Sequence, residues 1–401
     1  MRGRLCSVVA ACFGSASMAL PAQELELAGF ASIEPRLFLD APAFAGQTDN
    51  SLSFSAVLAP ELRWEWNDGD DRFTVVPYLR ADADDSERSH FDLREANWLH
   101  IGDPWTIRVG LGSVFWGVTE SRHLVDIVNQ RDQVDDIDEE DKLGQPMIHF
   151  ERFTGSGAFG IFLLPGFRER TFPAADARLR GPLPIDTSDP VYESGAKDKR
   201  TDVALRWDNS FGRWDIGLSG FYGTGREPRL VPTPVGAAAI VLVPHYDIIG
   251  QVGIDLQYTR NAWLWKLETI RRSGQGSTFS AVAAGVEYTL FGIRGGNADI
   301  GLLAEYLYDG RDEQAPPAAL DDDLFVGLRF ALNDVNDTMI LFGAITDREW
   351  RGTSAFLEGQ RRLWESWRLE LELRWLRGVD DVTLSGFRRD SFLTARLARF
   401  F

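Results

Sequence analysis

An acidic run at residues 132–141 holds the densest group of charged side chains in this sequence. Carboxylate oxygens attract cations, and in a suitable geometry they bind Ca²⁺. The run lacks the glycine-containing spacing of an EF-hand loop, and charge runs usually form solvated surface loops. We therefore expect no metal and no cofactor, only an electrostatic role. The carboxylates concerned are Asp135, Asp136, Asp138, Glu139, Glu140 and Asp141.

Four arginines form a basic counterpart to this run. They follow an apolar strand expected at residues 158–167. Their planar guanidinium groups suit bidentate contacts with phosphate or carboxylate, although the same residues could be ordinary loop charges. They are Arg168, Arg170, Arg178 and Arg180.

A serine, a histidine and an aspartate lie close together at Ser121, His123 and Asp126. A catalytic triad needs its members to converge in space, which this local spacing does not guarantee. The sequence also contains no G-x-S-x-G and no H-E-x-x-H motif. On a helix, His123 would lie one turn from Glu120 and from Asp126, as a buried polar pair that orients the segment. We expect that the protein is not an enzyme.

Strands rather than helices must position these groups. Residues 52–66 are apolar at every second position, a run longer than most strands of soluble proteins. In a soluble sandwich the apolar face would enter a shared core, whereas in an outer-membrane barrel it would face lipid. The same alternation recurs at residues 203–207, 214–222, 254–258, 263–267, 300–308 and 369–375.

The placement of tryptophan distinguishes these two architectures. The sequence has 13 Trp, and many of them stand at the ends of the expected strands, as in the aromatic girdle of a membrane barrel. These are Trp64, Trp66, Trp98, Trp105, Trp207, Trp214, Trp263, Trp364 and Trp367.

Short and long connections alternate along the chain, which is typical of an outer-membrane barrel with short periplasmic turns and long external loops. The short connections are expected at residues 67–71, 102–104, 154–157, 210–213, 261–262, 293–297, 333–337 and 364–366. The long ones are expected at residues 40–50, 117–145, 168–200, 224–245, 273–277, 310–320, 351–354 and 378–389. We predict an all-β, transmembrane, antiparallel up-and-down barrel of about 18 strands (16 to 18), formed as one domain by residues 23–401.

The first 22 residues indicate the compartment. Arg2 and Arg4 precede an apolar stretch at residues 5–19, as in a cleaved secretory signal peptide, and Cys6 and Cys12 both fall within it. The terminal Phe401 resembles the signal read by the barrel assembly machinery, although Arg399 departs from that pattern. We expect a cell outer membrane location in a Gram-negative bacterium, and the net charge of -18 argues against nucleic acid as a partner.

The segment at residues 117–145 follows the strand-like stretch 105–112 and does not alternate. We expect it to fold into the lumen or to lie at its mouth, where acids opposite arginines would set a transverse field. The external arginines could instead bind phosphates of lipopolysaccharide. The candidate pore and constriction residues are Arg108, His123, Asp126, Asp135, Asp136, Asp138, Glu139, Arg168, Arg170, Lys266, Glu268, Glu370, Glu372 and Arg374.

Three blocks carry a resemblance to known proteins. They are SVFWGVTESRHLVDIVNQRD at residues 113–132, KLGQPM at 142–147 and LLPGFRERTFP at 163–173. These blocks resemble segments of poorly characterised proteobacterial outer-membrane proteins of porin-like appearance. The resemblance implies a barrel and an outer-membrane location, and it supplies no substrate and no site residues.

The expected function is a channel for passive diffusion of small hydrophilic solutes, since a barrel of this size leaves an aqueous path. The net negative charge of the chain weakly favours the passage of cations over anions. The alternatives are a polysaccharide export barrel, a plugged structural barrel and a barrel hydrolase. Expected partners are outer-membrane lipid, lipopolysaccharide, small polar solutes and, in a homo-oligomer, further copies of the chain. The proline-rich run at residues 226–245 could plug the mouth, contact a neighbouring subunit or form an extra hairpin.

Overall fold

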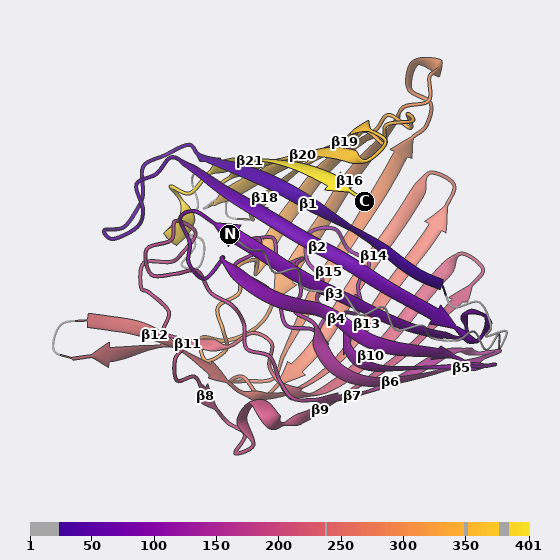
Figure 1. Ribbon diagram of the computed structural model, residues 1–401, viewed down its shortest axis with the longest axis horizontal. Coiled ribbons are helices and arrows are strands. Elements are labelled where there is room, and N and C mark those ends of the chain that lie inside the picture. The colour runs from indigo at the N-terminus through magenta and orange to yellow at the C-terminus, as the bar shows by residue number, and fades with distance from the viewer. Residues whose placement is uncertain (1–23, 237–238, 349–351, 377–384) are drawn as a thin grey trace, which may run out of the picture.

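The computed structural model describes residues 24–236, 239–348, 352–376 and 385–401, in which eighteen antiparallel strands close into one barrel (Figure 1). Each barrel strand pairs with the next barrel strand along the chain, and β21 pairs with β1. The strands are β1 (Glu24–Phe38), β2 (Leu52–Trp66), β3 (Asp71–Asp82), β4 (His90–Ile101), β5 (Trp105–Gly112), β6 (Gln145–Thr154), β7 (Gly157–Pro165), β9 (Thr201–Phe211), β10 (Trp214–Thr224), β13 (Ile248–Arg260), β14 (Trp263–Ser273), β15 (Phe279–Leu290), β16 (Asp299–Asp309), β17 (Asp322–Ala331), β18 (Met339–Asp347), β19 (Thr353–Trp364), β20 (Trp367–Trp375) and β21 (Phe392–Phe400).

The apolar face of each strand is the exposed face. In β2, Phe54 and Leu58 are 55% and 41% exposed, whereas the alternate residues Ser53 and Ser55 are 7% and 5% exposed. This is the reverse of a soluble sandwich, in which apolar side chains would be covered. Closure between β1 and β21 also gives every strand of the barrel two hydrogen-bonded neighbours, as a bilayer requires. The prediction of a transmembrane barrel of about 18 strands is confirmed.

Aromatic side chains gather at the end of the barrel that carries the short turns. The rings of Trp214 and Tyr258 are tilted against each other with centroids 4.5 Å apart, and the Trp263 ring centroid lies 4.6 Å from that of Tyr288. At the β19–β20 turn, Trp364 and Trp367 are 6.4 Å apart. Indole rings favour the level of the lipid headgroups, so these residues mark one membrane interface.

The predicted short turns all lie between consecutive strands of the barrel. The predicted long loops omitted one connection, residues 83–89, which joins β3 to β4. This segment contains neither glycine nor proline, the residues that most clearly mark a turn in a sequence.

A small three-stranded sheet stands outside the barrel at the end with the long loops (Figure 1). It consists of β8 (Val191–Tyr192), β11 (Arg229–Val235) and β12 (Ala239–Tyr246). Strands β11 and β12 form a hairpin, so of the three interpretations of residues 226–245 the structure shows the extra hairpin. Pro232 and Pro234 lie in β11, which pairs only with β12 and is protected as an edge strand because proline donates no backbone hydrogen bond.

Helical structure in the described residues is limited to four short 3-10 turns, and none of them has the length or apolar character to cross a bilayer. They are η1 (Asn67–Gly69), η2 (Lys197–Lys199), η3 (Ile293–Gly295) and η4 (Ser385–Phe387). The expected signal peptide, with both cysteines, lies outside the described residues.

Candidate functional site

The segment at residues 113–144, which joins β5 to β6, packs against inward side chains of the barrel wall. Its fully buried Val125 and Val128 belong to an apolar cluster that includes Phe162 of β7 and Ile270 of β14. Gly253 of β13 makes room for this contact, because a Cβ atom at that position would lie 2.9 Å from Cγ1 of Val125. An apolar core thus forms between the loop and the wall, on the face of the strands turned away from lipid.

Two wall carboxylates hold the backbone of residues 118–125, which we call the first arm. The Glu268 side chain, fully buried on β14, accepts hydrogen bonds from the backbone N–H groups of Val118 (2.7 Å), Thr119 (3.0 Å) and Val125 (3.2 Å). On β16, Glu305 accepts the N–H groups of Glu120 (2.8 Å) and Ser121 (2.9 Å). These charge-assisted bonds satisfy backbone donors that would otherwise be buried without a partner.

Residues 132–138, which we call the second arm, are held in the opposite way, by their own carboxylates. Asp135 accepts a hydrogen bond from the Tyr78 hydroxyl (2.7 Å) and lies 2.6 Å from Nε of Arg80. Asp132 lies 2.6 Å from Nη2 of Arg94 on β4. At the far end of the arm, Asp138 lies 3.2 Å from Nη2 of Arg374 on β20. The acidic run therefore faces a group of wall arginines.

The two arms reach separate sectors of the wall. The first arm contacts β14 and β16, and its Glu120 also pairs with Arg329 of β17 (2.6 Å). The second arm contacts β3, β4 and β20, and its Asp136 lies 3.5 Å from Arg36 of β1. In the closed strand order these sectors are separated by β18 and β19 on one side and by six strands on the other. The loop consequently joins two parts of the wall across the inside of the ring.

The structure brings most of the predicted site residues to one of these two sectors. His123 belongs to the first arm, and its Nδ1 lies 3.8 Å from Glu268. Lys266 lies beside the same arm, 3.6 Å from Glu120. Arg374, Glu372 and the acids of the second arm lie together on the other side. Glu139 and Arg170 are 3.6 Å apart, and Glu139 also pairs with Arg131.

Four of the predicted residues have no hydrogen bond or ion pair with either arm in the described part of the chain, although Asp92 and Arg396, the partners of two of them, also pair with Arg94 and Glu34. Arg168 pairs with Asp92 (2.7 Å), and Glu370 pairs with Arg396 (3.3 Å). Asp126 pairs with Lys142 within the loop itself. Arg108 lies on β5, where its buried Nε has no hydrogen-bond partner in the described residues.

Sequence reasoning missed the wall arginines that receive the second arm. Arg36, Arg80, Arg88 and Arg94 stand on the polar faces of β1, β3 and β4 or in the loop between the last two. Glu34, only 2% exposed, completes the group by pairing with Arg80 (2.7 Å) and Arg396 (2.8 Å). The available signal was a charged residue between apolar neighbours in a strand, as at Glu34 and Arg80.

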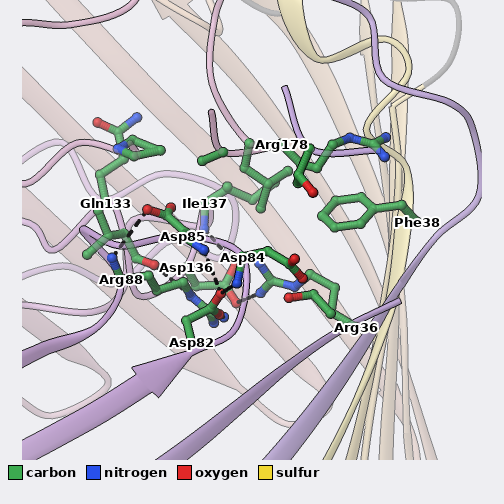
Figure 2. Close-up of a pocket in the computed structure, with 16 residues that line it drawn as sticks. Arg36, Phe38, Asp82, Asp84, Asp85, Arg88, Gln133, Asp136, Ile137 and Arg178 are labelled. Atoms are coloured by element: carbon green, nitrogen blue, oxygen red, sulfur yellow. Dashed lines mark hydrogen bonds and ion pairs between the residues drawn. The ribbon is translucent and has the colours of Figure 1, made fainter. Parts of the chain in front are cut away.

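A small cavity lies beside the second arm, between β1, the β3–β4 loop and the loop after β7 (Figure 2). Figure 2 shows Arg36, Phe38, Arg88, Asp136 and Arg178 among its lining residues. Its volume of about 40 Å³ suits a few water molecules and no larger solute. Arg178 is occupied by an ion pair with the buried Asp390 (3.1 Å).

The three residues considered as a triad do not assemble into one. Ser121 donates its hydroxyl to Glu305 (2.5 Å), Asp126 pairs with Lys142, and His123 lies beside Glu268 and the Phe115 ring. Within residues 113–144 no hydrogen bond or ion pair joins Ser121, His123 and Asp126, and no helix forms there. The described residues also contain no group of three or more His, Cys, Asp or Glu side chains that could hold a metal ion.

Burial and neighbouring charges shift the pKa values of several loop groups. Burial raises the pKa of Asp138 to about 7, and the Asp136 carboxylate adds to this rise while Arg374 opposes it. For Glu120, burial works against ionisation, but Arg329 and Lys266 together hold its pKa below the ordinary value. Asp138 is therefore a loop group whose charge changes near neutral pH.

Comparisons with known proteins identify the fold of this chain but assign it to no family. No family model and no curated protein matches the sequence. Among solved structures, the BenF-like porin from Pseudomonas fluorescens Pf-5 is 10% identical with a TM-score of 0.53, covering 95% of this chain and 98% of that chain. Pseudomonas aeruginosa OpdO is 12% identical with a TM-score of 0.54 (94% and 96% covered), and OccK2 (OpdF) in complex with glucuronate is 11% identical with a TM-score of 0.53 (94% and 97%). The chain has the barrel fold of outer-membrane porins.

Proposed function

We propose that the protein is an outer-membrane channel for passive diffusion of small hydrophilic solutes, narrowed by the loop at residues 113–144. One observation carries the proposal: this loop lies inside an 18-strand barrel and is held by Glu268 on one sector and by Arg80 and Arg94 on another. A barrel of this size encloses an aqueous path unless the interior is filled. A loop fixed on two sides narrows such a path at a defined level.

The charges around the loop favour polar solutes over apolar ones. Both arms present carboxylates beside guanidinium groups, so a solute passing between them meets alternating charges in a confined space. Most acids of the second arm are already paired with arginines, which reduces the cation preference expected from the net charge. Selectivity should then depend on solute size and dipole more than on the sign of the solute charge.

A plugged structural barrel is the second candidate, because the loop builds its own apolar core against the wall. Single-channel recording in planar bilayers separates the two functions. A steady open current from the purified protein supports the channel, and a silent barrel supports the plug. Replacement of residues 118–138 by a short glycine-serine linker should raise the conductance if the loop narrows an open path.

Several further features belong to the same proposal. We infer that residues 1–22 direct export and are removed, that the barrel assembly machinery inserts the chain, and that lipid and lipopolysaccharide surround it. Membership in the poorly characterised porin-like group, suggested by the three sequence blocks, is also part of the proposal. Crosslinking in outer-membrane vesicles would test for a homo-oligomer.

A further inference from the structure

The loop at residues 113–144 covers a large part of the inner face of the barrel. Each barrel strand from β6 to β16 contributes an inward side chain to the apolar cluster that the loop forms with the wall. Four of the larger ones are at most 5% exposed, namely Phe162 of β7, Phe221 of β10, Ile270 of β14 and Leu307 of β16. Because such cores are close-packed, no hydrated solute can pass along these strands at the level of the loop.

The second arm covers the inner face of the strands at the start of the chain. The wall side chains that pair with it there, Arg36 of β1 and Arg80 of β3, are each 5% exposed. Their neighbour Glu34, which pairs with Arg80, is 2% exposed. This sector is therefore also closed to solutes at the level of the loop.

The inner face of β19, between the sectors that the two arms contact, is less covered. Leu357 of β19 lies on the exposed outer face, so the next residue, Glu358, points into the barrel. Its side chain is 41% exposed, although it lies 2.8 Å from Arg374 beside the second arm. Glu358 thus stands at the level of the loop and in contact with water.

The two arms end on the strands that flank β18 and β19. Glu120 of the first arm pairs with Arg329 of β17 (2.6 Å), and β17 is the neighbour of β18. Asp138 of the second arm pairs with Arg374 of β20 (3.2 Å), and β20 is the neighbour of β19. The arms therefore leave β18 and β19 between them as a stretch of wall that neither arm contacts through an ion pair.

The charges around Glu358 are mostly negative. Arg374 is shared by three carboxylates, those of Asp138, Glu372 and Glu358 itself. Further carboxylates from both sides act electrostatically on Glu358, and these are Glu120, Asp136 and Glu140. Since one guanidinium cannot neutralise three carboxylates, this part of the lumen attracts a small cation or the positive end of a dipolar solute.

We propose that the permeation path runs along the inner face of β18 and β19, between the two arms, and that Glu358 is the wall residue that sets its remaining preference for cations over anions. The inference rests on the proposed channel function and locates the path within the lumen. Coverage of the other sectors decides the route, and the exposure of Glu358 decides which carboxylate a passing solute meets.

The test introduces one thiol with Glu358→Cys and records single channels in planar bilayers. Both cysteines of the sequence, Cys6 and Cys12, precede the described residues, and the parent treated in the same way measures any reaction elsewhere. Two methanethiosulfonate reagents are used, one carrying a trimethylammonium group and one carrying a sulfonate. Modification should lower the conductance at least about twofold. The cationic reagent should react on the order of 10-fold faster than the anionic one, because acidic surroundings concentrate cations.

The matched control is Glu61→Cys on β2. Glu61 is also an inward wall carboxylate, its side chain is 35% exposed, and it pairs with Arg63 (3.0 Å) nearer the short turns. In the described residues it has no hydrogen bond or ion pair with either arm. The control thiol should react with both reagents, and the current should stay close to that of the parent.

Glu358→Gln gives a second measurement that does not depend on the cysteine variant, because it keeps the size of the side chain and removes only the charge. Its reversal potential in a salt gradient should move toward anions, and that of Glu61→Gln should move less. A Glu358 thiol that does not react, or that reacts without lowering the current of a conducting barrel, would overturn the proposed path. Equal shifts in the two Gln variants would remove the special role of Glu358. A parent barrel that never conducts would instead contradict the channel itself, and the path with it.

Discussion

The two arms of the luminal loop are fixed by reversed chemistry. In the first arm the wall supplies the carboxylates, Glu268 and Glu305, and the loop supplies backbone N–H groups. In the second arm the loop supplies the carboxylates and the wall supplies arginines. The anchoring of the first arm to Glu268 and Glu305 therefore rests largely on its backbone, whereas the second arm depends on its carboxylates and on their ionisation.

The largest expected effect comes from removing the acceptor of the first arm with Glu268→Ala. This change leaves the N–H groups of Val118, Thr119 and Val125 without their partner in a buried site. At about 1–3 kcal/mol for each unsatisfied group, the free energy of unfolding should fall by about 3 kcal/mol or more. Chemical unfolding in detergent, followed by tryptophan fluorescence, measures the loss.

Glu370→Ala is the matched control, because Glu370 is a wall carboxylate with partly exposed partners that does not contact the loop. Its exposed pairs should contribute less than about 1 kcal/mol. A Glu268→Ala barrel as stable as the Glu370→Ala barrel would show that the first arm is not held by its backbone.

Asp135→Asn should have the next largest effect, on the second arm. The change keeps the shape of the side chain but removes the charge facing Arg80 and Arg94. Breaking a buried pair costs about 3–5 kcal/mol, and we expect about 2 kcal/mol here because Arg80 keeps Glu34 and Arg94 keeps Asp132.

The same variant should also alter ion selectivity. The two arginines lose part of their compensation, so the reversal potential in a salt gradient should move toward anions. A variant with parent stability and an unchanged reversal potential would contradict the interpretation of the second arm as a charged wall of the path.

A smaller effect, the change of ion selectivity with pH, should distinguish the second arm from the first. The pKa of Asp138 is about 7 in the folded protein, above its ordinary value of 3.8. A group with a raised folded pKa binds more protons in the folded state, so its contribution to stability falls as pH rises from about 4 to about 7. Ionisation also adds a negative charge to the second arm, and cation preference should increase over the same range.

Reversal potentials measured between about pH 5 and about pH 8 test this expectation, with a midpoint near 7. Asp138→Asn should abolish the midpoint while the first arm stays unaffected. A pH profile that Asp138→Asn leaves unchanged would place the titrating group elsewhere.

Ser121→Ala should have the smallest effect. It removes the hydroxyl donated to Glu305, but the N–H groups of Glu120 and Ser121 still bind that carboxylate. The loss should not exceed about 1 kcal/mol, and conductance should match the parent. If Ser121 serves only to fix the first arm, esterase assays should detect no hydrolysis by either the parent or the variant. Hydrolysis by the parent that Ser121→Ala abolishes would reverse that assignment.

The amino-acid sequence alone was sufficient for the barrel, its strand number and its short turns. Alternation in a strand is a local property, since successive side chains point to opposite faces whatever the rest of the chain does. Runs such as residues 52–66 therefore predicted which side chains face lipid, and the exposed Phe54 and Leu58 confirm it. The tryptophans at strand ends favoured the membrane for an equally local reason.

Only the tertiary structure decided which charges meet inside the barrel. Glu34 and Arg396 are 362 positions apart, and Asp138 and Arg374 are 236 positions apart, yet each pair is in contact. Closure of the strand ring brings the first pair together, and the path of the loop across the ring brings the second. Local periodicity predicts neither the closure of the strand ring nor the path of the loop, because both depend on how all eighteen strands register with one another.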